Sequence, residues 1–195
     1  LSQIGAFRGV NLVLAFLRSL KLTTERMDKV QLPVRVNGAG SGNAWYTTGN
    51  PTLNFLLASI QFVNSAYDTV FDHEAGHFWD DFTPGGIVNG GLSEGWGDIV
   101  SMYLLNNPII GEHFLKQPRP DADGNMVDYI RHGDNKYQYS DNDEVHDQGQ
   151  AWQGCAWKLR KAFIAKLGDA AGAALAEALV LPTMFAKASN IPAAM

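Results

Sequence analysis

Two histidines four positions apart constrain the fold of this chain more than any other feature. Residues 73–77 read His-Glu-Ala-Gly-His, and the apolar residues around them recur at steps of three and four. This period predicts a helix on which His73 and His77 lie on the same face, one turn apart. Glu74 follows His73 but is turned away from the histidine pair. Both imidazoles can therefore reach one common partner.

A second segment offers a carboxylate for the same partner. Apolar residues between 92 and 103 recur at helical spacing and predict an amphipathic helix that carries Glu94. Asp98 lies one turn further on the same face, where it can hold a metal-binding histidine through its second ring nitrogen. Two histidines and a glutamate, with a fourth position left for water, are typical ligands of a catalytic zinc ion. We expect one zinc at His73, His77 and Glu94; the alternative is an ordinary helix without metal.

The two segments together resemble the gluzincin metallopeptidases, and in particular the thermolysin and fungalysin groups. Residues 94–98, Glu-Gly-Trp-Gly-Asp, are closer to the Glu-Gly-Trp-Ser-Asp of fungalysin than to the Glu-Ala-Ile-Ser-Asp of thermolysin. The resemblance extends from about residue 33 to about residue 161. It implies a secreted zinc endopeptidase that acts on peptides or proteins. Glu74 is then the general base that takes a proton from the metal-activated water.

Residues 141–149 resemble the family segment that carries the transition-state histidine. The resemblance implies that His146 donates a hydrogen bond to the oxyanion of the tetrahedral intermediate, and that Asp141 orients its ring. A preplaced donor of this kind lowers the barrier to peptide hydrolysis. The alternative is that His146 is only a residue at the start of a helix.

The resemblance also implies four substrate-binding residues. Asn43 and Ala44 match the edge strand that pairs with an extended substrate, a form of β-augmentation. Arg131 resembles an arginine that holds a substrate carbonyl. Val70 matches a position that lines the pocket for the residue after the scissile bond. The alternatives are an ordinary edge strand, a solvated arginine and a core valine.

The expected fold is α+β and zincin-like, with a single metallopeptidase domain over residues 1–195. A small strand-bearing N-terminal lobe, about 1–82, and a mainly helical C-terminal lobe, about 83–195, would hold the zinc between them. Thr23 or Thr24 is expected to cap the second helix, and Asn64 or Ser65 the third. Strands and a hairpin are expected within residues 32–49. Helices are expected at 9–20, 23–30, 64–81, 92–106, 144–167 and 170–181.

Composition narrows the possible partners. The chain is 46% hydrophobic and 18% charged, as in an ordinary globular protein. Its net charge of −5 and its lack of a basic run make nucleic acid a poor partner. We expect no apolar run to be long enough to span a membrane, and no signal peptide is recognised. The single cysteine, Cys155, cannot form an intrachain disulfide and fits a core thiol. The oligomeric state stays open.

The loop-rich stretch 107–142 would line one wall of the cleft, because a loop of this length is usually functional. Within it, residues 121–125 resemble a fragment of a calcium loop. The bidentate glutamate of such loops is missing, and an Asp-Gly turn is favoured over calcium binding. The rival functions are a non-catalytic peptide-binding module and an aminopeptidase. An aminopeptidase needs an acidic site for the substrate amine, for which no motif is evident.

Overall fold

Helices form most of this α+β protein, whose computed structural model describes residues 1–121 and 123–195. The helices are α1 (Ser2–Ser19), α2 (Glu25–Lys29), α3 (Asp68–Phe82), α4 (Gly90–Leu105), α5 (Val145–Leu167), α6 (Asp169–Val180), the 3-10 helix η1 (Leu181–Ala186) and α7 (Ile191–Ala194). The strands are β1 (Val34–Gly38), β2 (Ala44–Thr47), β3 (Thr52–Leu56), β4 (Ile109–Ile110), β5 (Arg119–Pro120), β6 (Met126–Val127) and β7 (Arg131–His132). The α+β expectation is confirmed.

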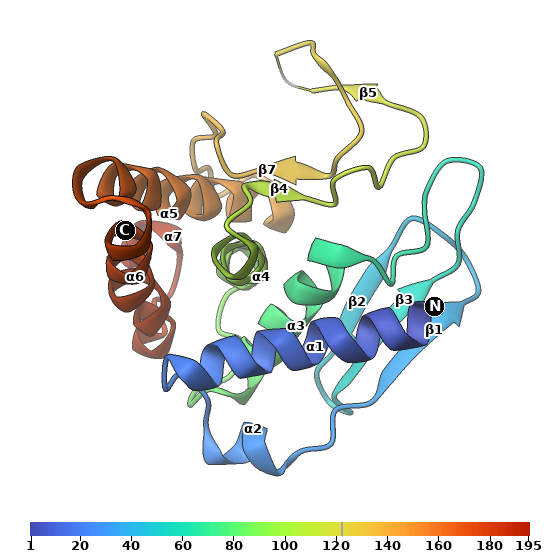
Figure 1. Ribbon diagram of the computed structural model, residues 1–195, viewed down its shortest axis with the longest axis horizontal. Coiled ribbons are helices and arrows are strands. Elements are labelled where there is room, and N and C mark those ends of the chain that lie inside the picture. The colour runs from blue at the N-terminus through green and yellow to red at the C-terminus, as the bar shows by residue number, and fades with distance from the viewer. Residues whose placement is uncertain (122) are drawn as a thin grey trace.

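Helix α4 lies at the centre of the molecule. Figure 1 shows it end-on, with α5 and α6 on one side and α3, α1 and the three-stranded sheet on the other. Its residues Ile99, Val100 and Met102 are fully buried in the main hydrophobic core. Burial of one such side chain stabilises the fold by about 1.5–3 kcal/mol. Because α3 packs directly against α4, the two segments marked by the sequence meet inside the core.

The three-stranded sheet has a different hairpin from the one expected. β3 is the central strand, since it pairs in parallel with β1 and antiparallel with β2. The hairpin therefore joins β2 to β3 through residues 48–51, and does not lie within residues 32–49. Every residue of β3 is buried, so this strand lacks the period-two pattern of a half-buried strand. β2 remains at an edge of the sheet.

One of the two expected helix caps is found. Thr24 caps α2 with its side chain, as predicted. Helix α3 begins only at Asp68 and has no side-chain cap. The expected caps, Asn64 and Ser65, bond to backbone groups before the helix; Ser65 Oγ, for example, accepts from the Leu56 N–H at 2.6 Å. These side chains are thus already engaged, and the helix starts later than predicted.

The C-terminal helical stretch corrects one expectation. Asp169–Ala186, which is α6 continued by η1, is long and apolar enough to cross a membrane by length and composition. The expectation that no run reaches this length is therefore wrong. Core helices pass the same test, which makes the finding weak support for a membrane span. One face of this stretch packs into the core through Ala176, Val180, Leu181 and Met184.

The connection between α4 and α5 is long, as expected, and short strands fold it back on itself. β4 pairs antiparallel with β7, which carries Arg131. β5 and β6 form a separate hairpin that projects from the body in Figure 1. The Asp121 carboxylate accepts hydrogen bonds from two backbone N–H groups that follow it, in keeping with the predicted turn. Residue 122 of that turn lies outside the described residues.

Candidate metal centre

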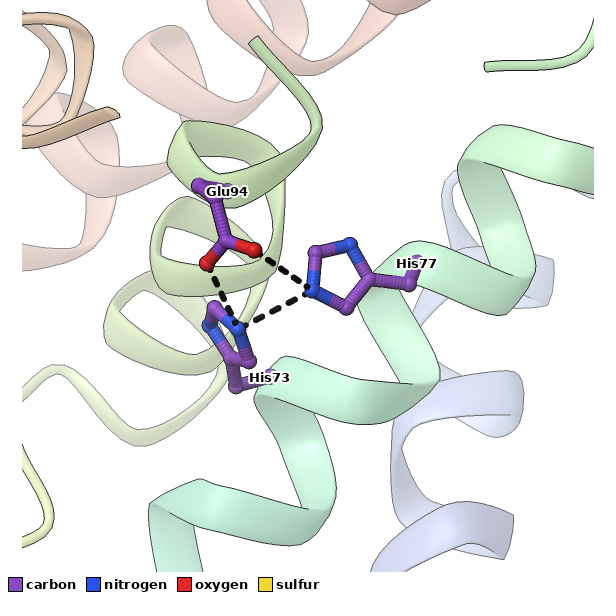
Figure 2. Close-up of side chains that lie close together, drawn as sticks. All are labelled: His73, His77 and Glu94. Atoms are coloured by element: carbon purple, nitrogen blue, oxygen red, sulfur yellow. Dashed lines mark hydrogen bonds and ion pairs between the residues drawn. The ribbon is translucent and has the colours of Figure 1, made fainter. Parts of the chain in front are cut away.

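Three side chains from α3 and α4 meet at one point. Figure 2 shows His73 and His77 on successive turns of α3, facing Glu94 on α4. His73 Nε2 lies 3.1 Å from His77 Nε2 and 3.2 Å from Glu94 Oε2. His77 Nε2 lies 3.5 Å from Glu94 Oε1. This group could hold a metal ion, so the three predicted ligands are assembled in one place.

Two glycines allow the ligand helices to come this close. A Cβ atom on Gly76 would lie 2.6 Å from Gly97 Cα, and a Cβ atom on Gly97 would lie 2.6 Å from His73 Nδ1. Closely packed interiors do not accommodate such contacts, so the two glycines set the separation of α3 and α4. Sequence reasoning missed both residues. Their signal was a glycine inside a helical pattern, which costs about 1 kcal/mol relative to alanine and calls for a packing reason.

A buried ion pair holds His73. Its Nδ1 lies 2.7 Å from Asp98 Oδ1, and Arg131 donates to both oxygens of Asp98 at 2.8 Å. Burial alone would raise the pKa of Asp98, but the charges and hydrogen bonds of Arg131 and His73 together outweigh burial and hold this pKa well below its usual range. The Nδ1–H of His73 therefore has a carboxylate acceptor, which leaves Nε2 for the metal. Arg131, expected at the substrate, is engaged with Asp98.

Ser93 contacts Nδ1 of His77, as Asp98 contacts Nδ1 of His73. Its Oγ lies 2.9 Å from His77 Nδ1, and its side chain is buried. Burial lowers the pKa of His77 to about 3, and the charge of His73 adds to this effect. His77 is therefore neutral, which is the form that binds a metal ion. Sequence reasoning missed Ser93, because a serine next to Glu94 has no spacing signal of its own.

The electrostatics of the cluster favour a cation. Burial would lower the pKa of His73, but Asp98 and Glu94 outweigh it and raise this pKa to about 10. Burial would raise the pKa of Glu94, but the hydrogen bond and charge of His73 bring it to about 2. The carboxylates thus hold a proton on the ring of His73. A metal ion that binds Nε2 takes the place of that proton, and binding releases protons.

Glu74 lies beside the cluster with an unpaired oxygen. Its side chain is buried, and its Oε2 has no hydrogen-bond partner among the described residues. Burial is the main cause that raises the pKa of Glu74 to about 7. Glu94 Oε2 is also buried, and the ring nitrogens His73 Nε2 and His146 Nε2 lie 3.2 Å and 3.4 Å from it. An unpaired buried polar atom costs about 1–3 kcal/mol, so the Oε2 atom of Glu74 fits a site built for a metal ion and water.

His146 lies at the mouth of the cluster, in the first turn of α5. Its Nε2 lies 3.4 Å from Glu94 Oε2, and half of its side chain is exposed. Its Nδ1 lies 2.6 Å from Glu144 Oε1, and Glu144 also caps α5 by accepting from the His146 N–H. Asp141, expected to orient this ring, accepts a hydrogen bond from the Tyr139 hydroxyl at 2.5 Å. Glu144 thus takes the place predicted for Asp141, because capping brings its carboxylate to the ring.

A cleft passes the cluster along β2. Two cavities of about 350 Å³ and 270 Å³ lie there and share part of their walls. As an edge strand, β2 has backbone groups that the sheet does not use. The backbone of Tyr46 in this strand hydrogen-bonds to Glu74, which ties the strand to the site. The residues shared by the two cavities are Asn43, Ala44, His73, Glu74 and His146.

The smaller cavity brings the predicted substrate residues together. Apolar side chains line it, among them Phe114 and Ile130. Val70, which lies one turn before His73 in α3, is buried against it. The cavity can therefore accept an apolar side chain. The predicted residues in its wall are Asn43, Ala44, Val70 and Arg131.

A larger cavity, of about 650 Å³, lies between α1 and β1 and is separate from the cluster. Its walls contain no histidine or acid among the described residues. Size alone therefore does not identify the functional site. The cluster of His73, His77 and Glu94, with Glu74 and the β2 cleft beside it, is the candidate functional site.

Comparison with protein-family models yields no match to this chain, and comparison with curated proteins yields none either. The function must therefore be inferred from the site itself. The observations available for this are the cluster of His73, His77 and Glu94, the buried Glu74 and the cleft along β2.

Proposed function

We propose that this chain is a secreted zinc endopeptidase with a zincin-like fold of the gluzincin type. The observation that carries the proposal is the meeting of two histidines and a glutamate beside a second buried glutamate, whose Oε2 has no hydrogen-bond partner among the described residues. Two imidazoles and one carboxylate suit zinc in a hydrolase. When bound, the zinc would supply Lewis acidity: it polarises a peptide carbonyl and lowers the pKa of water.

Glu74 acts as the general base. It is next to the ligands but is not one of them, and its free Oε2 is available to accept a proton. Burial raises its pKa to about 7, which suits a group that must take up and release a proton near neutral pH. Glu74 takes the proton of the attacking water and later passes it to the leaving amine.

His146 and β2 act on the substrate. His146 Nε2, at the mouth of the cluster, donates to the carbonyl oxygen as negative charge develops there. The open edge of β2 pairs with the extended substrate backbone. The apolar cavity beside Val70 receives the side chain that follows the scissile bond.

The shape of the cleft favours internal cleavage over removal of an N-terminal residue. The two cavities meet at the cluster, so a chain can extend on both sides of it. Among the described residues, their walls hold no acid besides Glu74 and Glu94. A substrate amine therefore finds no separate carboxylate to bind.

The proposal is tested with Glu74→Gln on casein. The variant keeps the three ligands, so it should retain zinc while hydrolysis falls about 10²- to 10⁴-fold. Glu25→Gln, an exposed glutamate on α2, is the matched control and should cleave at the native rate. Undiminished cleavage by zinc-loaded Glu74→Gln would contradict the assignment of the base. A native chain that holds zinc and binds casein without cleaving it would instead be a peptide-binding module.

A further inference from the structure

A row of three buried polar side chains begins at the Nδ1 atom of His77. Ser93 contacts the imidazole, Asp80 lies next to Ser93, and Lys187 bonds to Asp80. Ser93 and Asp80 are each 3% exposed, and the Lys187 side chain is 12% exposed. None of the three is a ligand in the cluster. Buried polar and charged groups are unfavourable unless each is paired, so this arrangement calls for a reason.

Metal binding by His77 would determine which way the Ser93 hydroxyl donates its hydrogen. His77 can bind a metal ion through Nε2 only if Nδ1 carries the proton, and Ser93 Oγ at 2.9 Å accepts that proton. The hydroxyl must then donate its own hydrogen to another acceptor. Asp80 provides it: burial raises the pKa of Asp80, and hydrogen bonds from Lys187 and Ser93 oppose that rise.

Lys187 keeps Asp80 in place. Its Nζ donates to Asp80 Oδ1 at 2.5 Å and to the Asp80 backbone oxygen at 3.0 Å. Lys187 follows η1 and has a φ of 49°, a left-handed conformation that a residue other than glycine rarely adopts. The chain thus keeps an unfavourable backbone conformation at the residue whose side chain reaches Asp80.

We propose that Asp80 and Lys187 are positioning residues of the metal site, which act through Ser93 to fix the Nδ1 proton and the ring orientation of His77. A carboxylate that accepts from the Ser93 hydroxyl makes its oxygen a better acceptor, and Nε2 of His77 becomes a stronger ligand. The inference rests on the proposed function, because it takes zinc as the ion.

The two ligand histidines are then supported in the same way. His73 is backed directly by Asp98, which is paired with Arg131. His77 is backed through Ser93 by Asp80, which is paired with Lys187. The segment that follows α6 thereby contributes to zinc affinity. A purely structural ion pair would only fasten η1 to α3.

The test is zinc affinity, measured by competition with a chromophoric chelator. Ser93→Ala and Asp80→Asn should each weaken binding about tenfold, the loss typical of removing such support from a metal ligand. The double variant should bind no more weakly than the weaker single one, because both changes break one relay. Glu177→Gln is the control: it breaks the buried Arg160–Glu177 pair away from the cluster and should leave zinc affinity unchanged.

Zinc affinity of Asp80→Asn equal to the native value, together with a lower melting temperature, would overturn the inference. Should Asp80→Asn fail to fold, Ser93→Thr keeps the hydroxyl and should bind zinc almost as well as the native chain. Equal binding by Ser93→Ala and Ser93→Thr would then overturn it. Failure of the native chain itself to bind zinc is a different result, which contradicts the proposed function.

Discussion

The two candidate ligand histidines, His73 and His77, differ from His146 in how far the protein encloses them. His73 and His77 are almost enclosed, with exposed side-chain fractions of 7% and 12%. The side chain of His146 is 50% exposed and lies in the first turn of α5. A close-packed, paired side chain has one position, whereas an exposed ring can change rotamer rapidly.

In the proposed function, this difference separates two tasks within one site. The metal ligands need a fixed geometry, because a site that is loose by about 1 Å loses much of its function. A residue that meets the substrate can reach its final hydrogen-bond geometry when the substrate binds. Damage to the enclosed part should therefore appear in metal binding and stability, and damage at His146 in turnover alone.

The largest expected effect lies on the exposed side. His146→Ala should lower kcat about 10²- to 10³-fold, since the oxyanion loses a donor where its charge develops. KM, zinc content and melting temperature should stay near the native values. Steady-state kinetics with a peptide substrate measures this. A parent-like kcat would leave His146 without a catalytic role.

The enclosed side is tested next by Asp98→Asn. The change weakens the acceptor of the His73 Nδ1–H, and zinc affinity should fall about 10- to 100-fold. The protein should also unfold at a lower temperature, because Arg131 stays buried without its charged partner. Asp28→Asn, in the half-exposed Arg18–Asp28 pair, is the control and should alter neither property. Native zinc affinity in Asp98→Asn would remove the distinction drawn between the two regions.

Packing of the ligand helices is probed by Gly97→Ala. The added methyl group would meet His73 Nδ1 at 2.6 Å, so stability should fall by about 1–3 kcal/mol and zinc affinity should fall with it. A methyl group on Gly49 would meet no described residue within 4 Å, so Gly49→Ala should be close to neutral. Urea denaturation of the zinc-free proteins gives the stability of each variant, and competition with a chromophoric chelator gives its zinc affinity. If the two variants were equally stable, α3 and α4 could move apart to accept the methyl group without loss of folding free energy, which would contradict the role given to Gly97.

The smallest expected effect concerns the support of His146. Glu144→Gln keeps the helix cap but removes the charge beside the ring, and kcat should fall by less than about tenfold, since the pair is exposed. Asp141→Asn should leave kcat unchanged, because its carboxylate contacts Tyr139 instead. The reverse result would restore the sequence expectation for Asp141.

The features that could be predicted from the sequence are those that depend on the spacing of residues within one helix. The spacing of His73 and His77 places them on one helical face, and the apolar period around Glu94 places it on a second helix. The residues that lie near the cluster were also found, among them Val70 and Arg131. Strand β3 was missed, because its burial on both faces removes the alternation that marks a strand.

Contacts between distant segments could not be predicted. The partner of Arg131 is Asp98, and Arg131 lies on β7, which pairs with β4 after the end of α4. The contact of Gly76 with Gly97 depends on how α3 and α4 pack, which neither helix encodes alone. The same holds for Lys187, which reaches Asp80 from the far end of the chain.

Zinc content of the purified chain tests the central claim most directly. Elemental analysis should find about one zinc per chain, which a chelator removes and dialysis against zinc restores. Glu94→Ala, which loses the carboxylate ligand, should hold far less zinc under the same conditions. A folded native chain that contains no transition metal, even after dialysis against zinc, would contradict the assignment of His73, His77 and Glu94 as a metal site.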